Sequence, residues 1–216
     1  MRPVITAFEN SPDRGQGLAR DMRVRWALEE LGASCDVRLM SFDTLKQPEH
    51  LARQPFGQLP TYEDEDVTLF ESGSILIYLA DRHGGLLPPD PVNRARAITW
   101  MFAALNTVEP PVFDRAMLHV LEADKPWFQE RLKAVEGLID KRLASLSACL
   151  GERDWLEEGF TGGDLLMATV LMRLKGSALL AAYPNLVAYL ARAEARPAFQ
   201  RAWQAQYATY IAANPM

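Results

Sequence analysis

The fold is decided by the stretch Phe56-Gly57-Gln58-Leu59-Pro60-Thr61-Tyr62, which is followed by Leu69-Phe70-Glu71-Ser72-Gly73. Residues 60–63 and 67–70 read as two short strands around an acidic turn at residues 64–66. So short a connection requires the two strands to pair antiparallel. Ser72 is a good N-cap for a helix that fades near residues 83–85. A strand, strand, helix unit is therefore predicted here.

The residues before this stretch predict two further strands and two helices. Val4 to Phe8 is a β-branched and aromatic run typical of a buried strand. From about Ala19 the apolar residues follow two helical stripes and end at Gly32, which indicates a helix pressed between layers. Residues 35–39 alternate as a second strand, and a weak helix follows around residues 45–53. The predicted order is β-α-β-α-β-β-α.

A proline-rich segment marks the predicted domain boundary. Residues 86–91 carry three prolines in four positions, which cannot continue a helix. We expect an α/β domain at residues 1–85, a linker at 86–91, and an all-helical domain at 92–216. Within the helical part, Thr161 and Asp164 have the form of a capping box, so Asp164 is interpreted as a folding residue.

Composition bounds the possible partners and location. The 216 residues are 49% hydrophobic and 24% charged, with a net charge of -5, which is ordinary for a globular protein and leaves no broad basic face for nucleic acid. No apolar run reaches membrane-spanning length. The two cysteines and three histidines lack metal-ligand spacing, so no metal is expected. We therefore predict a cytoplasmic location.

Four motifs occur in an order and spacing that resemble the cytosolic glutathione transferases, in a form typical of bacteria. These motifs span residues 22–32, 55–61, 70–79 and 160–164. The resemblance covers essentially the whole chain and implies a thioredoxin-like first domain with a mixed sheet. It also implies a cis bond before Pro60 and a homodimer.

The resemblance implies a glutathione site on the first domain. A cis bond before Pro60 turns the backbone of Leu59 outward, where it can pair with the cysteinyl amide edge of glutathione. Glu71 can hold the γ-glutamyl ammonium, and Ser72 at a helix N-terminus can receive the γ-glutamyl carboxylate. The expected glutathione-binding residues are Lys46, Gln58, Leu59, Pro60, Glu71 and Ser72. Read alone, Glu71 and Ser72 form a helix cap and Lys46 is a solvated lysine.

The resemblance places the thiol-activating group soon after the first strand, where Ser11 is the available hydroxyl. In relatives with a Ser-Pro element, only a few residues separate that element from the first helix. This chain has an insert there, Asp13 to Arg20. Ser11 either caps the first helix or ends the strand beneath a loop formed by the insert. In the second geometry a group of the insert can also stabilise the thiolate.

The resemblance also implies a hydrophobic substrate pocket on the first long helix of the second domain. The expected lining is Trp100, Met101, Leu105, Val108 and Phe113, although apolar residues at helical spacing are more often core. The predicted function is conjugation of glutathione to a hydrophobic electrophile. Two alternatives stay open: a glutathione-dependent disulfide reductase, and a non-catalytic module of the same fold that binds a protein partner.

Overall fold

The computed structural model describes residues 2–215, which form two compact units. Among the described residues, the first unit comprises 2–87 and 195–215, and the second comprises Pro88–Glu194. The elements of the first unit are β1 (Val4–Phe8), α1 (Asp21–Glu30), β2 (Asp36–Met40), the 3-10 turn η1 (Thr44–Lys46), α2 (Pro48–Leu51), β3 (Thr61–Glu63), β4 (Thr68–Phe70), α3 (Ser72–His83) and α10 (Pro197–Ala213). The predicted β-α-β-α-β-β-α order and the thioredoxin-like class are confirmed.

The sheet of the first unit is mixed, with strand order β2-β1-β3-β4. β1 pairs parallel with β2, so that Ile5 lies opposite Val37. β3 runs antiparallel to both neighbours and places Tyr62 opposite Ile5 on one side and Leu69 on the other. This arrangement brings the residues before β3 and after β4 to neighbouring positions, because Thr61 pairs with Phe70.

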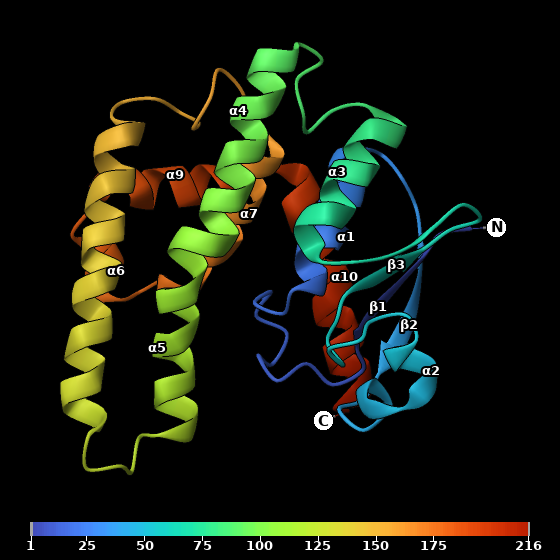
Figure 1. Cartoon of the computed structure of the whole chain (residues 1–216), viewed down its shortest axis with the longest axis horizontal. Helices are drawn as coiled ribbons and strands as arrows, with labels where there is room; N and C mark the ends of the chain where they lie inside the picture. Colours follow the sequence, from blue (N-terminus) through green and yellow to red (C-terminus); the bar gives the residue numbers. More distant parts are fainter. Residues whose placement is uncertain (1, 216) are drawn as a thin grey trace. The chain divides into compact units, whose positions relative to one another are not determined.

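Helix α1 is covered on both of its apolar stripes. It contacts β1 and α3 on the sheet side and α10 on the other side, and Figure 1 shows α10 running beside it. The ring of Trp26 packs edge-on against Phe199 at 5.0 Å between centroids. Arg196 adds a two-pronged ion pair to Glu30, with N to O distances of 2.6 and 2.8 Å.

The last helix therefore lies in the first compact unit, whereas the sequence assigned residues 92–216 to one helical domain. The physical reason is the second apolar stripe of α1, which needs a cover that the sheet cannot supply. The periodicity of α1 indicates that such a cover exists but does not identify α10 as the element that provides it.

A buried carboxylate fastens the β3–β4 hairpin to α3. The Asp64 side chain accepts hydrogen bonds from the hydroxyls of Tyr62, at 3.0 Å, and Tyr78, at 2.8 Å. It also accepts from the backbone N–H groups of Asp66 and Val67. Burial alone raises the pKa of Asp64, but these donors outweigh it and lower the pKa to about 2. The acidic turn is thus a structural fastening of the hairpin.

The second unit is helical throughout its regular elements. These are α4 (Pro91–Phe102), the π-helical segment η2 (Ala103–Val108), α5 (Glu109–Leu121), α6 (Phe128–Leu150), α7 (Gly162–Leu171), the 3-10 turn η3 (Met172–Leu174), α8 (Ala178–Ala181) and α9 (Pro184–Glu194). Every residue of α7 is buried. At Gly163 an added Cβ would lie 2.6 Å from Cβ of Trp100, so glycine permits the close approach of α7 to α4.

The capping box predicted at the start of α7 is present. Asp164 is fully buried, and its carboxylate accepts from the N–H groups of Leu156 and Thr161 and from the hydroxyl of Tyr189, at 2.9, 2.9 and 3.0 Å. Burial raises the pKa of this carboxyl, against the opposing effect of those hydrogen bonds. Asp164 is thus tied into the helical core, as expected of a folding residue.

Pro110 and Pro111 lie in the first turn of α5 and do not interrupt the run of helical residues. The six residues of η2 precede α5, which begins at Glu109. A proline has no N–H and its ring crowds the carbonyl four residues earlier, and a wider turn relieves that crowding.

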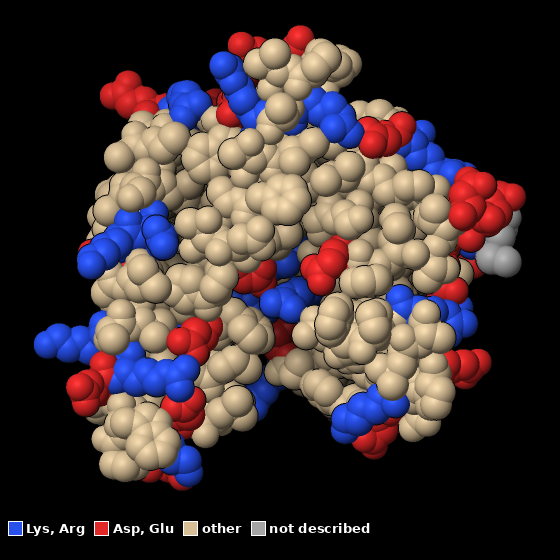
Figure 2. Space-filling model, in the orientation of Figure 1, with Lys and Arg blue, Asp and Glu red and all other residues tan. Residues whose placement is uncertain are grey.

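Within residues 2–215, no helix combines the length and apolarity needed to cross a bilayer. Acidic and basic side chains are interspersed on the face seen in Figure 2.

Candidate functional site

The segment before β3 presents the backbone of Leu59. The Leu59–Pro60 peptide bond is cis, as the resemblance implied. The Leu59 side chain is buried in a small cluster with Met40 and Leu45. Across residues 2–215, the backbone N–H and C=O of Leu59 have no hydrogen-bond partner. The peptide edge of Leu59 is thus available to an extended ligand.

His50 forms a hydrogen bond to the backbone just before Leu59, a role that the sequence did not indicate. His50 is buried, and its Nε2 donates to the carbonyl of Gln58 at 2.7 Å. A carbonyl oxygen can only accept, so the proton of the imidazole is on Nε2. Gln54 adds a second tie by accepting from the N–H of Phe56 at 2.6 Å. These contacts fix the backbone while the side chain of Gln58 stays exposed.

Glu71 and Ser72 lie where β4 passes into α3. Glu71 has φ 67° and ψ 113°, a conformation that a bulky non-glycine residue rarely adopts. Such strain persists only where the surrounding structure imposes it, and it concentrates at functional sites. The Glu71 side chain is exposed, whereas Ser72 is 5% exposed. The first hydrogen bond of α3 runs from the N–H of Ile75 to the carbonyl of Glu71, so the preceding N–H groups face outward from the helix end.

Behind Ser72 lies a guanidinium that the sequence did not single out. Arg23 of α1 is 3% exposed, and its Nη1 donates to Oγ of Ser72 at 3.2 Å. The residue lies in a motif used for the resemblance, but neither periodicity nor spacing showed which side of α1 faces α3. Lys46 on η1, by contrast, is 74% exposed with its Nζ 3.5 Å from Oδ1 of Asp43, and its role toward a ligand stays a prediction.

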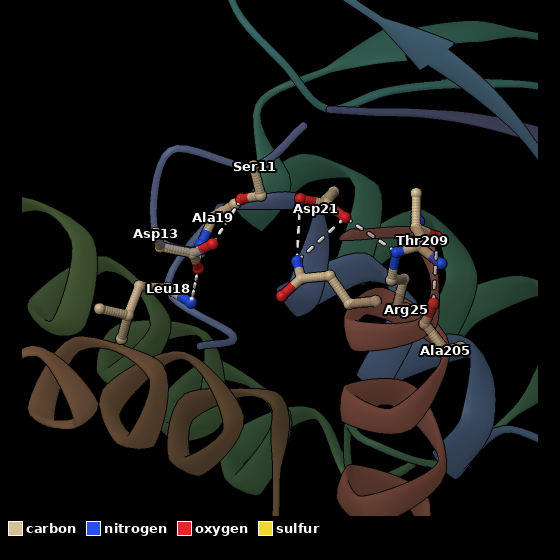
Figure 3. A network of polar contacts seen from close by, with 9 residues as sticks. Ser11, Asp13, Leu18, Ala19, Asp21, Arg25, Ala205 and Thr209 are labelled. Carbon is tan, nitrogen blue, oxygen red and sulfur yellow. Dashed lines mark hydrogen bonds and ion pairs between the residues drawn. The ribbon is translucent and has the colours of Figure 1, made fainter. Parts of the chain in front are cut away.

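The insert from Asp13 to Arg20 is an irregular loop, and α1 begins only at Asp21. Ser11 therefore does not cap α1, and it lies in irregular backbone three residues after the end of β1 at Phe8. It is 5% exposed, and its hydroxyl donates to Oδ1 of Asp13 at 2.5 Å (Figure 3). The sequence analysis left that hydroxyl either capping or free. In the structure it is held by a carboxylate.

Asp13 organises the whole loop. Its Oδ1 also accepts from the N–H of Gly15. Its Oδ2 accepts from the N–H groups of Leu18 and Ala19 (Figure 3). An Asp two residues before a Gly is a recognisable signal for such a turn, and the sequence reasoning did not use it. The Asp13 carboxylate thus has four hydrogen-bond donors, of which the Ser11 hydroxyl is one.

The apolar residues assigned to the substrate pocket lie on α4, η2 and α5 of the second unit. Met101 and Val108 are 2% and 5% exposed, which is typical of core packing. Trp100, Leu105 and Phe113 are half-buried, and Nε1 of Trp100 donates to Glu157 at 3.0 Å. The substrate pocket remains a prediction. The three half-buried residues are better placed to contact a substrate than the buried Met101 and Val108. Over the described part of the chain, residues 2–215, no group of His, Cys, Asp and Glu is placed to hold a metal ion.

Comparisons with known proteins identify the family to which the chain belongs. The N-terminal domain of the glutathione S-transferases is recognised over residues 15–81. Glutathione S-transferase 4 of Zea mays is 31% identical over 201 residues, covering 84% of this chain and 86% of the relative. Maleylacetoacetate isomerase of Rhizobium meliloti is 34% identical over 198 residues, covering 83% and 89%. The chain belongs to the glutathione S-transferase family of enzymes.

A solved structure extends the likeness to three dimensions. The glutathione transferase of Burkholderia graminis, with two glutathione molecules bound per subunit, superposes with a TM-score of 0.83 at 26% identity. The match covers 94% of this chain and 88% of that one.

Proposed function

We propose that this protein binds glutathione on its first unit and transfers the thiolate to a hydrophobic electrophile. The observation that carries the proposal is the pairing of the strained Glu71 with Ser72 at the N-terminus of α3. In this binding mode Glu71 holds the ammonium and Ser72 the carboxylate of the γ-glutamyl group. The open peptide edge of Leu59 pairs with the cysteinyl amide, with Gln58 and Lys46 toward the glycine carboxylate.

Ser11 is the proposed donor to the glutathione sulfur. The chemistry requires a thiolate from a group whose ordinary pKa is about 8.5, so a donor must face the sulfur. The Ser11 hydroxyl has one proton, which it donates to Oδ1 of Asp13. Rotation of the hydroxyl toward sulfur leaves Asp13 with its three backbone donors. The thiolate then attacks the electron-poor carbon of the electrophile and displaces its leaving group.

The wider setting is also a proposal. Family membership supports a cytoplasmic homodimer that detoxifies electrophiles, with Trp100, Leu105 and Phe113 contacting the apolar substrate. Glutathione serves as co-substrate, and no metal takes part.

The test is turnover of a chlorinated nitroarene by the wild type and by Ser11→Ala. Loss of one catalytic hydrogen-bond donor is expected to lower kcat at least about tenfold while leaving glutathione affinity unchanged. Ser34→Ala, an exposed serine elsewhere in the first unit, is the matched control and is expected to keep full activity. Unchanged turnover in Ser11→Ala would remove Ser11 as the donor. Absence of nitroarene turnover in the wild type would refute conjugation.

Disulfide reduction is a second candidate, favoured by the two glutathione molecules in the Burkholderia graminis structure. A subunit that accepts two thiols is suited to thiol–disulfide exchange. The bound thiolate attacks the glutathione sulfur of a mixed disulfide, forming glutathione disulfide and releasing the other half as a thiolate. Assaying the wild type with a mixed disulfide and with the nitroarene separates the candidates, because activity on the disulfide alone would replace conjugation by reduction.

A further inference from the structure

The contact between Arg23 and Ser72 determines the direction of the Ser72 hydroxyl. A guanidinium has five N–H donors and no acceptor, and it stays charged at any physiological pH. The 3.2 Å contact from Nη1 of Arg23 to Oγ of Ser72 therefore uses a lone pair of the oxygen. The single proton of the hydroxyl is left for another acceptor. In residues 2–215 that proton has no acceptor.

Both side chains are fixed by burial. Arg23 is 3% exposed and Ser72 is 5% exposed, and α1 and α3 pack against each other within the first unit. A buried guanidinium in van der Waals contact with its surroundings has little freedom to reorient. The Ser72 hydroxyl is thus oriented before any ligand arrives, and it belongs to the same helix end as the outward N–H groups of α3.

We propose that Arg23 is a positioning residue that makes this helix end selective for a carboxylate. This inference rests on the proposed function, because the carboxylate is that of the γ-glutamyl group of glutathione. By accepting from Arg23, Ser72 presents its proton outward, and only an acceptor-rich anionic group satisfies that proton together with the N–H groups of α3. Arg23 does not touch the ligand, and it acts through Ser72.

The test compares glutathione with an analogue that lacks the α-carboxylate of the γ-glutamyl residue, 4-aminobutanoyl-cysteinylglycine. Equilibrium dissociation constants are measured for the wild type, Arg23→Met, Arg23→Lys and Ser72→Ala. Arg23→Met is expected to weaken glutathione binding at least about tenfold, the usual effect of losing a charge-assisted hydrogen bond, while changing analogue binding less than about twofold. Arg23→Lys keeps a donor and is expected to recover part of the affinity.

Two controls distinguish positioning from a structural role. Arg201→Met removes an ion pair to Glu29 on the opposite side of α1 and is expected to change neither ligand. The double variant Arg23→Met with Ser72→Ala is expected to bind glutathione no more weakly than the weaker single variant. Thermal unfolding identifies variants that do not fold, and Arg23→Lys carries the test if Arg23→Met is among them.

Equal losses for glutathione and the analogue in the folded Arg23 variants, or additive losses in the double variant, would overturn the role of Arg23. Failure of the wild type to bind glutathione is a different result, and it would refute the proposed function itself.

Discussion

Gly15 is expected to be the costliest glycine in the Ser11–Arg20 loop to replace by alanine. Its φ of +73° lies in the left-handed region, which costs an L-residue about 1–2 kcal/mol. An added Cβ would also lie 2.9 Å from Cδ2 of Tyr207 and 3.1 Å from Cβ of Tyr210, both on α10. Overpacking of this kind costs about 1–3 kcal/mol. We expect Gly15→Ala to lower the free energy of unfolding by about 3 kcal/mol in total.

Urea unfolding followed by fluorescence and circular dichroism measures this loss, with Gly32→Ala as the matched control. Gly32 has a similar φ of +63°, but an added Cβ there meets nothing within 4 Å. Only the backbone term applies to Gly32, so a loss of about 1 kcal/mol is expected. Equal losses in the two variants would show that the loop yields to α10 without cost, and the packing argument would then be wrong.

Three further outcomes follow from single residues. The pKa of Asp64 is lowered in the folded state, so the ionised carboxylate contributes about 2 kcal/mol to the free energy of unfolding above about pH 4, and this contribution disappears as the pH falls toward 2. Asp64→Asn should therefore reduce the dependence of the free energy of unfolding on pH between about 4 and 2, and an unchanged dependence would contradict this. Asp164→Ala should cost about 3 kcal/mol in urea unfolding, because several buried donors lose their acceptor, and a loss below about 1 kcal/mol would contradict the burial argument. Glu71→Gly should raise stability by about 1 kcal/mol by relieving the positive φ, while weakening glutathione binding, and a variant that keeps full affinity would remove Glu71 from the site.

The order of elements in the first unit could be predicted because each element carries its own periodicity. The strands at Val4–Phe8 and Thr61–Glu63 and the helix start near Ser72 are local patterns, and the structure contains them. The N-cap role predicted for Ser72 is wrong, because Glu71 holds the N-cap position and Ser72 is the first helical residue. The resemblance supplied the cis bond before Pro60. The partner of a buried face is not a local property, and so the place of α10 could not be read from α1.

Part of the candidate site could likewise be predicted from the sequence, and part could not. A helix start at Ser72 has a local sequence signature, whereas the binding roles predicted for Glu71 and Ser72 came from the family resemblance. Arg23 was missed because the direction of one side chain on a helix buried all round leaves no trace in its pattern. Asp13 was missed because its role depends on the path of an irregular loop, in which the chain returns to the carboxylate at Leu18 and Ala19.

The place of α10 in the first unit also determines which of the two units can complete its folding first during synthesis. The first unit is discontinuous in sequence, since residues 195–215 pack with residues 2–87 and are separated from them by the whole helical unit. A ribosome releases Trp26 long before Phe199, which packs on it, while the helical unit is one uninterrupted stretch. Domains fold as units while the chain emerges. The half of the protein that is made first is therefore finished last.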